Sequence, residues 1–196
     1  MNRLCNCMLF CFVLVSSVSA QDKHPSAEIF GGYSYLNFQV KLGFDPTPVD
    51  RQRAHGVGIN AAINFSDRLG IVGDGSYNAK GVSVPSLFGS NKINVQHIYF
   101  LFGPRLSFRG DRATGFLQTL VGGAHITDEF GSQHRTTDLA LAIGGGVDLK
   151  ISKRLAIRAL QVDYLPSRRR LASTNEKDWL QNLRAQFGIV FRFGGD

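Results

Sequence analysis

Residues 55–65, HGVGINAAINF, alternate strictly between two kinds of side chain. Apolar side chains, most of them large, occupy every second position, namely Val57, Ile59, Ala61, Ile63 and Phe65. The positions between them are small or polar, namely Gly56, Gly58, Asn60, Ala62 and Asn64. Because successive side chains of a β-strand point to opposite faces, this period of two predicts a strand with one apolar and one polar face.

Seven other segments follow the same alternation and are also predicted to be strands. They comprise residues 28–38, 69–78, 96–108, 114–125, 137–151, 155–165 and 179–193. The facing of residues 114–125 and 155–165 is ambiguous. In the second of these, Arg158 and Asp163 share a face only if a β-bulge lies between them.

The connections between these strands alternate between short and long. Three are short, at residues 66–68, 109–113 and 152–154, and four are long, at residues 41–54, 80–95, 126–138 and 166–178. The long connections hold most of the Pro, Ser, Thr and Asn, which is typical of loops. This alternation predicts an all-β, antiparallel, up-and-down meander that has both termini and every short turn at one end.

The chain of 196 residues suits one domain preceded by an export segment. Residues 1–20 combine a positive charge at Arg3, an apolar run over residues 8–15 and small residues up to Ala20, which is the pattern of a secretory signal peptide. We therefore expect a signal peptide at 1–20 and a barrel domain at 21–196. All the cysteines lie in the signal segment, so we expect no disulfide and no thiolate metal site after cleavage.

The two unlike faces of the strands predict how the sheet closes. An eight-stranded barrel has an interior only wide enough for its own side chains. Small and charged side chains fit such a bore, whereas a full set of Leu, Ile and Phe does not. The large apolar face must therefore point outward, and an outward apolar band requires lipid. Because closure pairs every backbone group, as a bilayer demands, we predict an eight-stranded antiparallel up-and-down transmembrane β-barrel.

Aromatic residues gather near the ends of the predicted strands, as they do in the two girdles of membrane barrels. We expect one girdle near the long loops, formed by Tyr35, Tyr77, Tyr99, Tyr164 and Trp179. We expect the other near the short turns, formed by Phe65, Phe108, Phe116, Phe191 and Phe193.

Four segments give the chain a resemblance to known proteins: residues 28–35 (EIFGGYSY), 102–105 (FGPR), 161–164 (QVDY) and 188–193 (GIVFRF). In these segments the chain resembles the small eight-stranded outer-membrane barrels of Gram-negative bacteria, of the OmpA, OmpX and OmpW type. More narrowly, it resembles the outer membrane protein beta-barrel domain proteins. The resemblance implies a place in the cell outer membrane. It also implies that Gly188, Phe191 and Phe193 belong to a C-terminal signal read by the barrel-assembly machinery.

Charged residues interrupt the small face of the strands and form a predicted interior charge network. Its members are Glu28, Asp74, Arg105, Asp148, Lys150, Asp163 and Arg184, with Arg158 as a further candidate. Unpaired charges in a narrow bore are costly, so these groups are expected to pair. The network is then either a polar plug or a gated ion path whose pairs can switch, and the narrow bore favours the plug.

The candidates for a catalytic role are the histidines His24, His55, His97, His125 and His134 and the serines Ser76 and Ser107. A serine nucleophile needs a base within hydrogen-bond reach. Outer-membrane lipid A deacylases place a histidine and a serine two residues apart on a strand. In this chain the residue two positions after His125 is Thr127, and the residue two positions after His97 is Tyr99. We therefore predict that the protein is not an enzyme and has no catalytic residue, metal site or cofactor.

Basic residues are frequent in the long connections, and Arg168, Arg169 and Arg170 follow one another in the last of them. Arginine pairs well with phosphate, so this loop is predicted to bind lipopolysaccharide. Outer-membrane lipid is the other expected partner, whereas an exported barrel would not meet nucleic acid. We predict a monomer with a structural or surface-interaction role in envelope integrity, lipopolysaccharide contact or adhesion. The alternatives are a narrow pore or carrier for small or hydrophobic solutes, and a lipid A-modifying enzyme.

Overall fold

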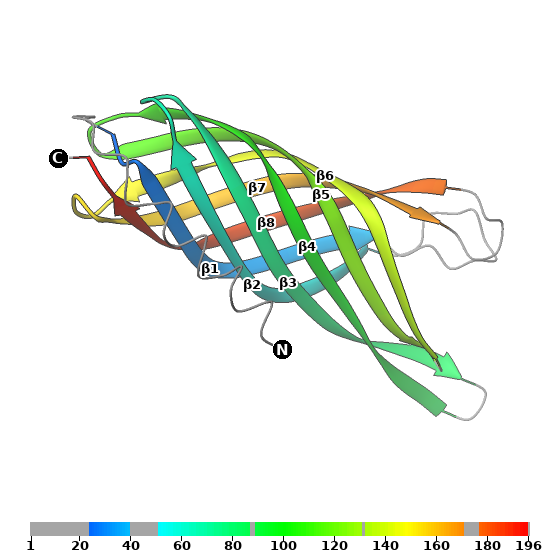
Figure 1. Ribbon diagram of the computed structural model, residues 1–196. Coiled ribbons are helices and arrows are strands. Elements are labelled where there is room, and N and C mark those ends of the chain that lie inside the picture. The colour runs from blue at the N-terminus through cyan, green and yellow to red at the C-terminus, as the bar shows by residue number, and fades with distance from the viewer. Residues whose placement is uncertain (1–23, 40–50, 87–88, 131, 171–176, 196) are drawn as a thin grey trace, which may run out of the picture.

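The computed structural model describes residues 24–39, 51–86, 89–130, 132–170 and 177–195 (Figure 1). The predicted signal peptide lies outside these residues, as does most of the first long connection. No helix in the described ranges is long and apolar enough to cross a membrane.

Eight antiparallel strands close into one barrel in which each strand pairs with its sequence neighbours and β1 pairs with β8. The strands are β1 (Ala27–Gln39), β2 (Arg51–Asn64), β3 (Leu69–Ser86), β4 (Gly89–Arg109), β5 (Ala113–Phe130), β6 (Ser132–Lys150), β7 (Leu155–Arg170) and β8 (Lys177–Phe193). This closed barrel confirms the predicted fold class and the order of its strands.

The short turns at one end have a local chemical cause. In the β2–β3 turn the Ser66 hydroxyl accepts a hydrogen bond from the Leu69 amide at 3.0 Å, and in the β6–β7 turn Ser152 accepts one from the Leu155 amide at 3.1 Å. Both turns have a serine three residues before a leucine that opens the next strand. Such side-chain contacts to the backbone stabilise tight reversals of the chain.

The strands extend further toward the long-loop end than the alternation predicted. Residues 80–95 and 126–138 were expected to be loops, but most of them belong to paired strands that reach Ser86↔Gly89 in β3–β4 and Phe130↔Ser132 in β5–β6. Residues 166–170 also continue β7. The prediction was wrong here because a hairpin outside the lipid needs no apolar face, so the period of two fades while backbone pairing continues.

The long-loop end of the barrel divides into two groups of strands. The pairing of β2 with β3 stops at His55↔Ala79, and that of β6 with β7 stops at Ala140↔Ser167, although all four strands continue. As Figure 1 shows, the β3–β4 hairpin and the β7–β8 hairpin leave the barrel in different directions. The described hairpins therefore project beyond the closed part of the barrel.

Large apolar side chains point outward, as the alternation predicted. Val57, Ile59, Phe100 and Phe102 are each at least 60% exposed. Two aromatic residues assigned to the girdles instead point inward: Tyr99 and Phe116 are buried in the bore. Each shares the parity of polar interior residues on its own strand, so the alternation along the strand, and not nearness to a strand end, determined the facing. Trp179 is among the residues whose side chains are not described.

The interior is less uniformly polar than predicted. A buried apolar cluster, most of it toward the long-loop end, comprises Leu36, Phe38, Ala54, Ala62, Val72, Tyr99, Leu101, Leu120, Ala124, Ala140, Ala142 and Leu165. Charged side chains fill the middle of the bore and its short-turn end, where they alternate with a few members of this cluster such as Ala62 and Val72. A few large side chains fit because small residues lie next to them, as Ala142 does to Leu120 on the neighbouring strand.

Glycines allow β1 and β8 to approach closely at the closure of the barrel. Gly32 pairs with Gly188, and a Cβ on Gly188 would lie 2.4 Å from the Gly31 carbonyl oxygen and 2.5 Å from the Gly32 Cα. Both neighbours are backbone atoms, so they cannot move without shifting a strand. A Cβ on Gly31, which faces outward, would have nothing within 4 Å.

We predict that Gly188→Ala lowers the stability of the folded barrel by about 1–3 kcal/mol, because the added methyl overpacks the β1–β8 contact. The measurement is the urea midpoint of the SDS-resistant, heat-modifiable band on a gel. Gly31→Ala is the matched control and should keep the wild-type midpoint. Equal midpoints for the two variants would contradict the close packing of these strands.

Candidate functional site

Near the short turns, the network is organised around Asp148. This carboxylate accepts hydrogen bonds from Arg158 Nε at 2.7 Å and Nη2 at 3.1 Å, and from Arg105 Nη2 at 3.5 Å. Arg105 also lies 3.6 Å from a carboxylate oxygen of Glu28, whose other oxygen accepts from Arg109 Nη1 at 2.8 Å. Strands β1, β4, β6 and β7 are thus tied together across the bore.

Two phenylalanines form the apolar surfaces against which these guanidinium groups pack. The Arg105 guanidinium lies 3.7 Å from the Phe116 ring centroid, and that of Arg158 lies 4.5 Å from the same centroid and 4.4 Å from that of Phe30. Such cation–π contacts stabilise a positive charge where water is scarce. The inward facing of Phe116 therefore has a physical reason, because it sits between two arginines.

Further along the bore, Arg184 joins two carboxylates. Its Nη1 donates to Asp74 at 2.6 Å and to the Ser76 hydroxyl at 2.9 Å, while its Nη2 donates to Asp163 at 2.8 Å. Asp163 also accepts from Gln118 at 3.1 Å. Since a guanidinium has several donors in one plane, it can bridge strands β3, β7 and β8 from the middle of the bore.

Gln161 connects the two groups of charges. It accepts a hydrogen bond from Arg158 Nη1 at 2.7 Å and donates to Asp163 at 2.7 Å. The pairing of β7 shifts register between Arg158 and Gln161, and the pairing of β6 with β7 shifts at Val147/Asp148. This bulge places Arg158 and Asp163 on the same interior face, which the alternation allowed only if a bulge was present.

Toward the long-loop end, the bore is closed by members of the apolar cluster and by a few polar contacts. Asn182 donates to the Tyr99 hydroxyl at 3.3 Å and to the Ser167 hydroxyl at 3.2 Å. The buried His97 ring lies 4.3 Å from that of Phe38, centroid to centroid, and stacks on Tyr99. The interior therefore changes from ionic to mainly apolar toward the long-loop end.

The structure places six of the seven predicted network residues in the bore: Glu28, Asp74, Arg105, Asp148, Asp163 and Arg184 are buried. Lys150 is not among them. It is exposed at the end of β6, and its Nζ donates to the Gly110 carbonyl at 2.6 Å. The prediction for Lys150 was wrong because the strand ends there and the side chain reaches the neighbouring turn.

The sequence interpretation missed several partners of the network. Arg109 lay just beyond the predicted end of its strand. Gln161 lies at the β-bulge, where the alternation of side chains no longer predicts which residue faces the bore. Gln118 lay on a strand of ambiguous facing. Arg192 shared the parity of Arg184, and that signal could have identified it.

Other candidate residues lie apart from the network. Phe191 and Phe193 are half-exposed on the outer face of β8, and their assembly role stays a prediction. The backbone of Arg168, Arg169 and Arg170 pairs with β8, but their side chains lie outside the described part. Among the described residues, no group of three His, Cys, Asp or Glu side chains is placed to hold a metal ion.

We predict that Asp163→Asn and Arg184→Gln each destabilise the barrel by about 3–5 kcal/mol, because each removes one charge from a buried cluster and leaves the opposite charge undercompensated. The double variant should lose less than the sum of the two, since the Asp163–Arg184 interaction is then lost only once. Urea unfolding in lipid vesicles measures this coupling. Asp111→Asn, an exposed change of the same kind, is the control. Additive losses would show that the pair is not coupled.

Comparison with known proteins agrees with this architecture. The family model of the outer membrane protein beta-barrel domain matches residues 8–194. No curated protein sequence matches the chain. Neisserial surface protein A is similar in structure, with a TM-score of 0.63 and 12% identity over 86% of this chain and 97% of that one.

Two other solved barrels share the fold. OprG from Pseudomonas aeruginosa has a TM-score of 0.60 and 12% identity over 88% of this chain and 97% of its own. Ail, the attachment invasion locus protein of Yersinia pestis, has a TM-score of 0.54 and 18% identity over 86% of this chain and 99% of its own. With the family model spanning almost the whole sequence, the chain belongs to the outer membrane protein beta-barrel domain family, which confirms the resemblance seen in its sequence and implies a place in the outer membrane.

Proposed function

We propose that this protein is a non-conducting outer-membrane barrel with a structural or surface-interaction role, and that its long-loop end contacts lipopolysaccharide. The filled bore is the observation that carries this proposal. The ionic network that includes Glu28 and Asp74 fills the barrel together with the apolar cluster, and the side chains of both are almost entirely buried. A barrel so filled acts through its surfaces rather than through its interior.

The projecting hairpins support a surface role. The β3–β4 and β5–β6 hairpins remain paired beyond the closed part of the barrel, so they present ordered backbone outside the apolar band. The family supports the same orientation, because in outer-membrane barrels the longer connections face the outside of the cell. These hairpins would then lie among the sugars and phosphates of the outer leaflet.

Charge identifies lipopolysaccharide as the expected contact. Arg168, Arg169 and Arg170 extend β7 at this end, and the side chain of Arg53 on β2 is exposed there. Guanidinium groups bind phosphate oxygens through paired hydrogen bonds. Contact of this kind would anchor the barrel in the outer leaflet and contribute to envelope integrity or adhesion. The structural similarity to an attachment invasion locus protein and a surface protein is in keeping with this role.

We predict that changing Arg168, Arg169 and Arg170 together to Gln weakens binding to lipopolysaccharide by about tenfold or more, since three phosphate-pairing groups are lost. Titration of lipopolysaccharide into the folded barrel in a non-ionic detergent measures the affinity. The control changes three exposed basic residues of the short-turn end, Arg68, Arg112 and Lys153, to Gln. A loss of equal size in the control would mean that net charge alone governs binding and would contradict the assignment to this loop.

The alternative of a narrow pore makes the opposite prediction for conductance. We expect the purified barrel to give no steady, voltage-stable openings in a planar bilayer, because paired charges and apolar side chains fill its bore. A conducting porin measured in the same bilayer provides the positive control. Reproducible openings that change when Arg184 is replaced by Gln would favour the pore over the surface role.

A further inference from the structure

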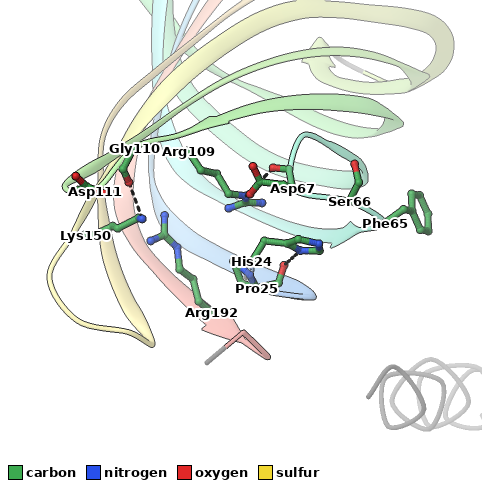
Figure 2. A pocket seen from close by; sticks show the side chains of 10 residues that line it. All are labelled: His24, Pro25, Phe65, Ser66, Asp67, Arg109, Gly110, Asp111, Lys150 and Arg192. Carbon is green, nitrogen blue, oxygen red and sulfur yellow. Dashed lines mark hydrogen bonds and ion pairs between the residues drawn. The ribbon is translucent and has the colours of Figure 1, made fainter. Parts of the chain in front are cut away.

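A pocket of about 810 Å³ opens at the short-turn end of the barrel (Figure 2). Its walls come from the segment before β1, from the β2–β3 and β4–β5 turns, and from the ends of β4, β6 and β8. The lining residues are His24, Pro25, Phe65, Ser66, Asp67, Arg109, Gly110, Asp111, Lys150 and Arg192. A volume of several hundred Å³ is typical of pockets that hold small molecules.

Three cationic side chains from three strands point into this pocket: Arg109, Lys150 and Arg192 (Figure 2). Two carboxylates, Asp67 and Asp111, also line it but are exposed at the rim. Asp67 lies 3.8 Å from Arg109 Nε, a long distance for an ion pair that faces water. The interior of the pocket is therefore positive, and its rim carries the compensating charge.

Two buried donors of these arginines are unused by the described residues. Arg109 Nη2 and Arg192 Nε have no hydrogen-bond partner there. Arg192 is only 3% exposed, and its Nη2 donates a long hydrogen bond of 3.4 Å to the Thr114 hydroxyl. Leaving a buried charged donor without a partner costs free energy, which a bound acceptor would recover.

The ionic network also carries more guanidinium groups than carboxylates. Five arginines of the bore and its mouth, Arg105, Arg109, Arg158, Arg184 and Arg192, accompany four carboxylates, Glu28, Asp74, Asp148 and Asp163. The carboxylates are all engaged by the first four arginines. Arg192 lies opposite Glu28 in the β1–β8 pair, so the excess positive charge falls at this end of the bore, where Arg109, Arg192 and Lys150 line the pocket.

The wall formed by the segment before β1 is held in place by hydrogen bonds and close packing. The Asn64 side-chain amide donates to the Pro25 carbonyl at 2.7 Å, and the Asn64 backbone amide donates to the Ser26 carbonyl at 2.8 Å. Gly194 and Gly195 have positive φ angles of 70° and 83°, and a Cβ on Gly195 would lie 2.7 Å from the His24 carbonyl. The two ends of the described chain are thus pressed together beside Arg192, and the pocket is preorganised.

We propose that this pocket is an oxyanion site that binds a phosphate or carboxylate group through the guanidinium groups of Arg192 and Arg109 and the Lys150 ammonium. Guanidinium and ammonium groups are the donors that such anions prefer, and their convergence from separate strands fixes the position of the anion. The site lies at the opposite end of the barrel from the proposed lipopolysaccharide contact, so it is independent of that function.

The test is calorimetric titration of inorganic phosphate into the folded wild-type barrel in octyl glucoside, a detergent without charge or phosphate. We expect saturable binding at one site. Arg192→Gln and Lys150→Gln should each weaken it by about tenfold or more, since each removes a charged donor. Lys150 is exposed and outside the ionic network, so its variant stays informative if Arg192→Gln fails to give the heat-modifiable folded band.

Lys153→Gln is the matched control, because it removes the same charge from the same end of the barrel but does not line the pocket. It should bind phosphate like the wild type. Absence of saturable binding, or equal losses in Lys150→Gln and Lys153→Gln, would overturn the site and leave only diffuse attraction to a basic surface.

A second phosphate titration, with the barrel in a lipid bilayer, identifies the source of the anion. Phe65 is 65% exposed and belongs both to the outer apolar face and to the pocket rim, so a phospholipid headgroup could reach the site from the inner leaflet. If headgroups occupy it, phosphate affinity should fall when the barrel is moved from octyl glucoside to phosphatidylglycerol nanodiscs. An unchanged affinity would identify a soluble anion instead. Both results require the site.

Discussion

The narrow bore of an eight-stranded barrel is the constraint on which the rest of this molecule depends. No water layer can separate the side chains inside, so each charged group must find a partner from another strand. Asp148 and Asp163 meet this demand by accepting from arginines and glutamines on neighbouring walls. The same contacts that satisfy the charges also hold the strands in register. Charge pairing and barrel closure therefore depend on the same hydrogen bonds.

The two ends of the barrel differ because the interior changes character along its axis. Toward the long loops, residues such as Leu36, Tyr99 and Leu165 exclude water from the bore. Toward the short turns, guanidinium groups outnumber carboxylates and the bore opens into a basic pocket. Family membership places the barrel in a membrane whose two sides are themselves unlike, and the proposed contacts differ accordingly at each end.

Small residues allow this filling. Where Gly32 meets Gly188, two strands approach more closely than any side chain would permit. At the turns, Ser66 and Ser152 satisfy backbone amides that would otherwise face solvent. Small residues therefore set the spacing of these strands in the barrel wall. The long arginine side chains fill the space inside the bore.

Alternation along the chain was enough to determine eight strands, their antiparallel order and the outward facing of residues such as Val57 and Phe102, because lipid and a narrow bore select opposite side chains at successive positions. It also pointed to Arg184 and Asp148 as interior charges. Only the tertiary structure decided that a bulge aligns Arg158 with Asp163, and that Arg192 faces a pocket while Lys150 leaves the bore. Those features depend on which residues of distant strands meet across the barrel, and a pattern read along one strand does not contain that information.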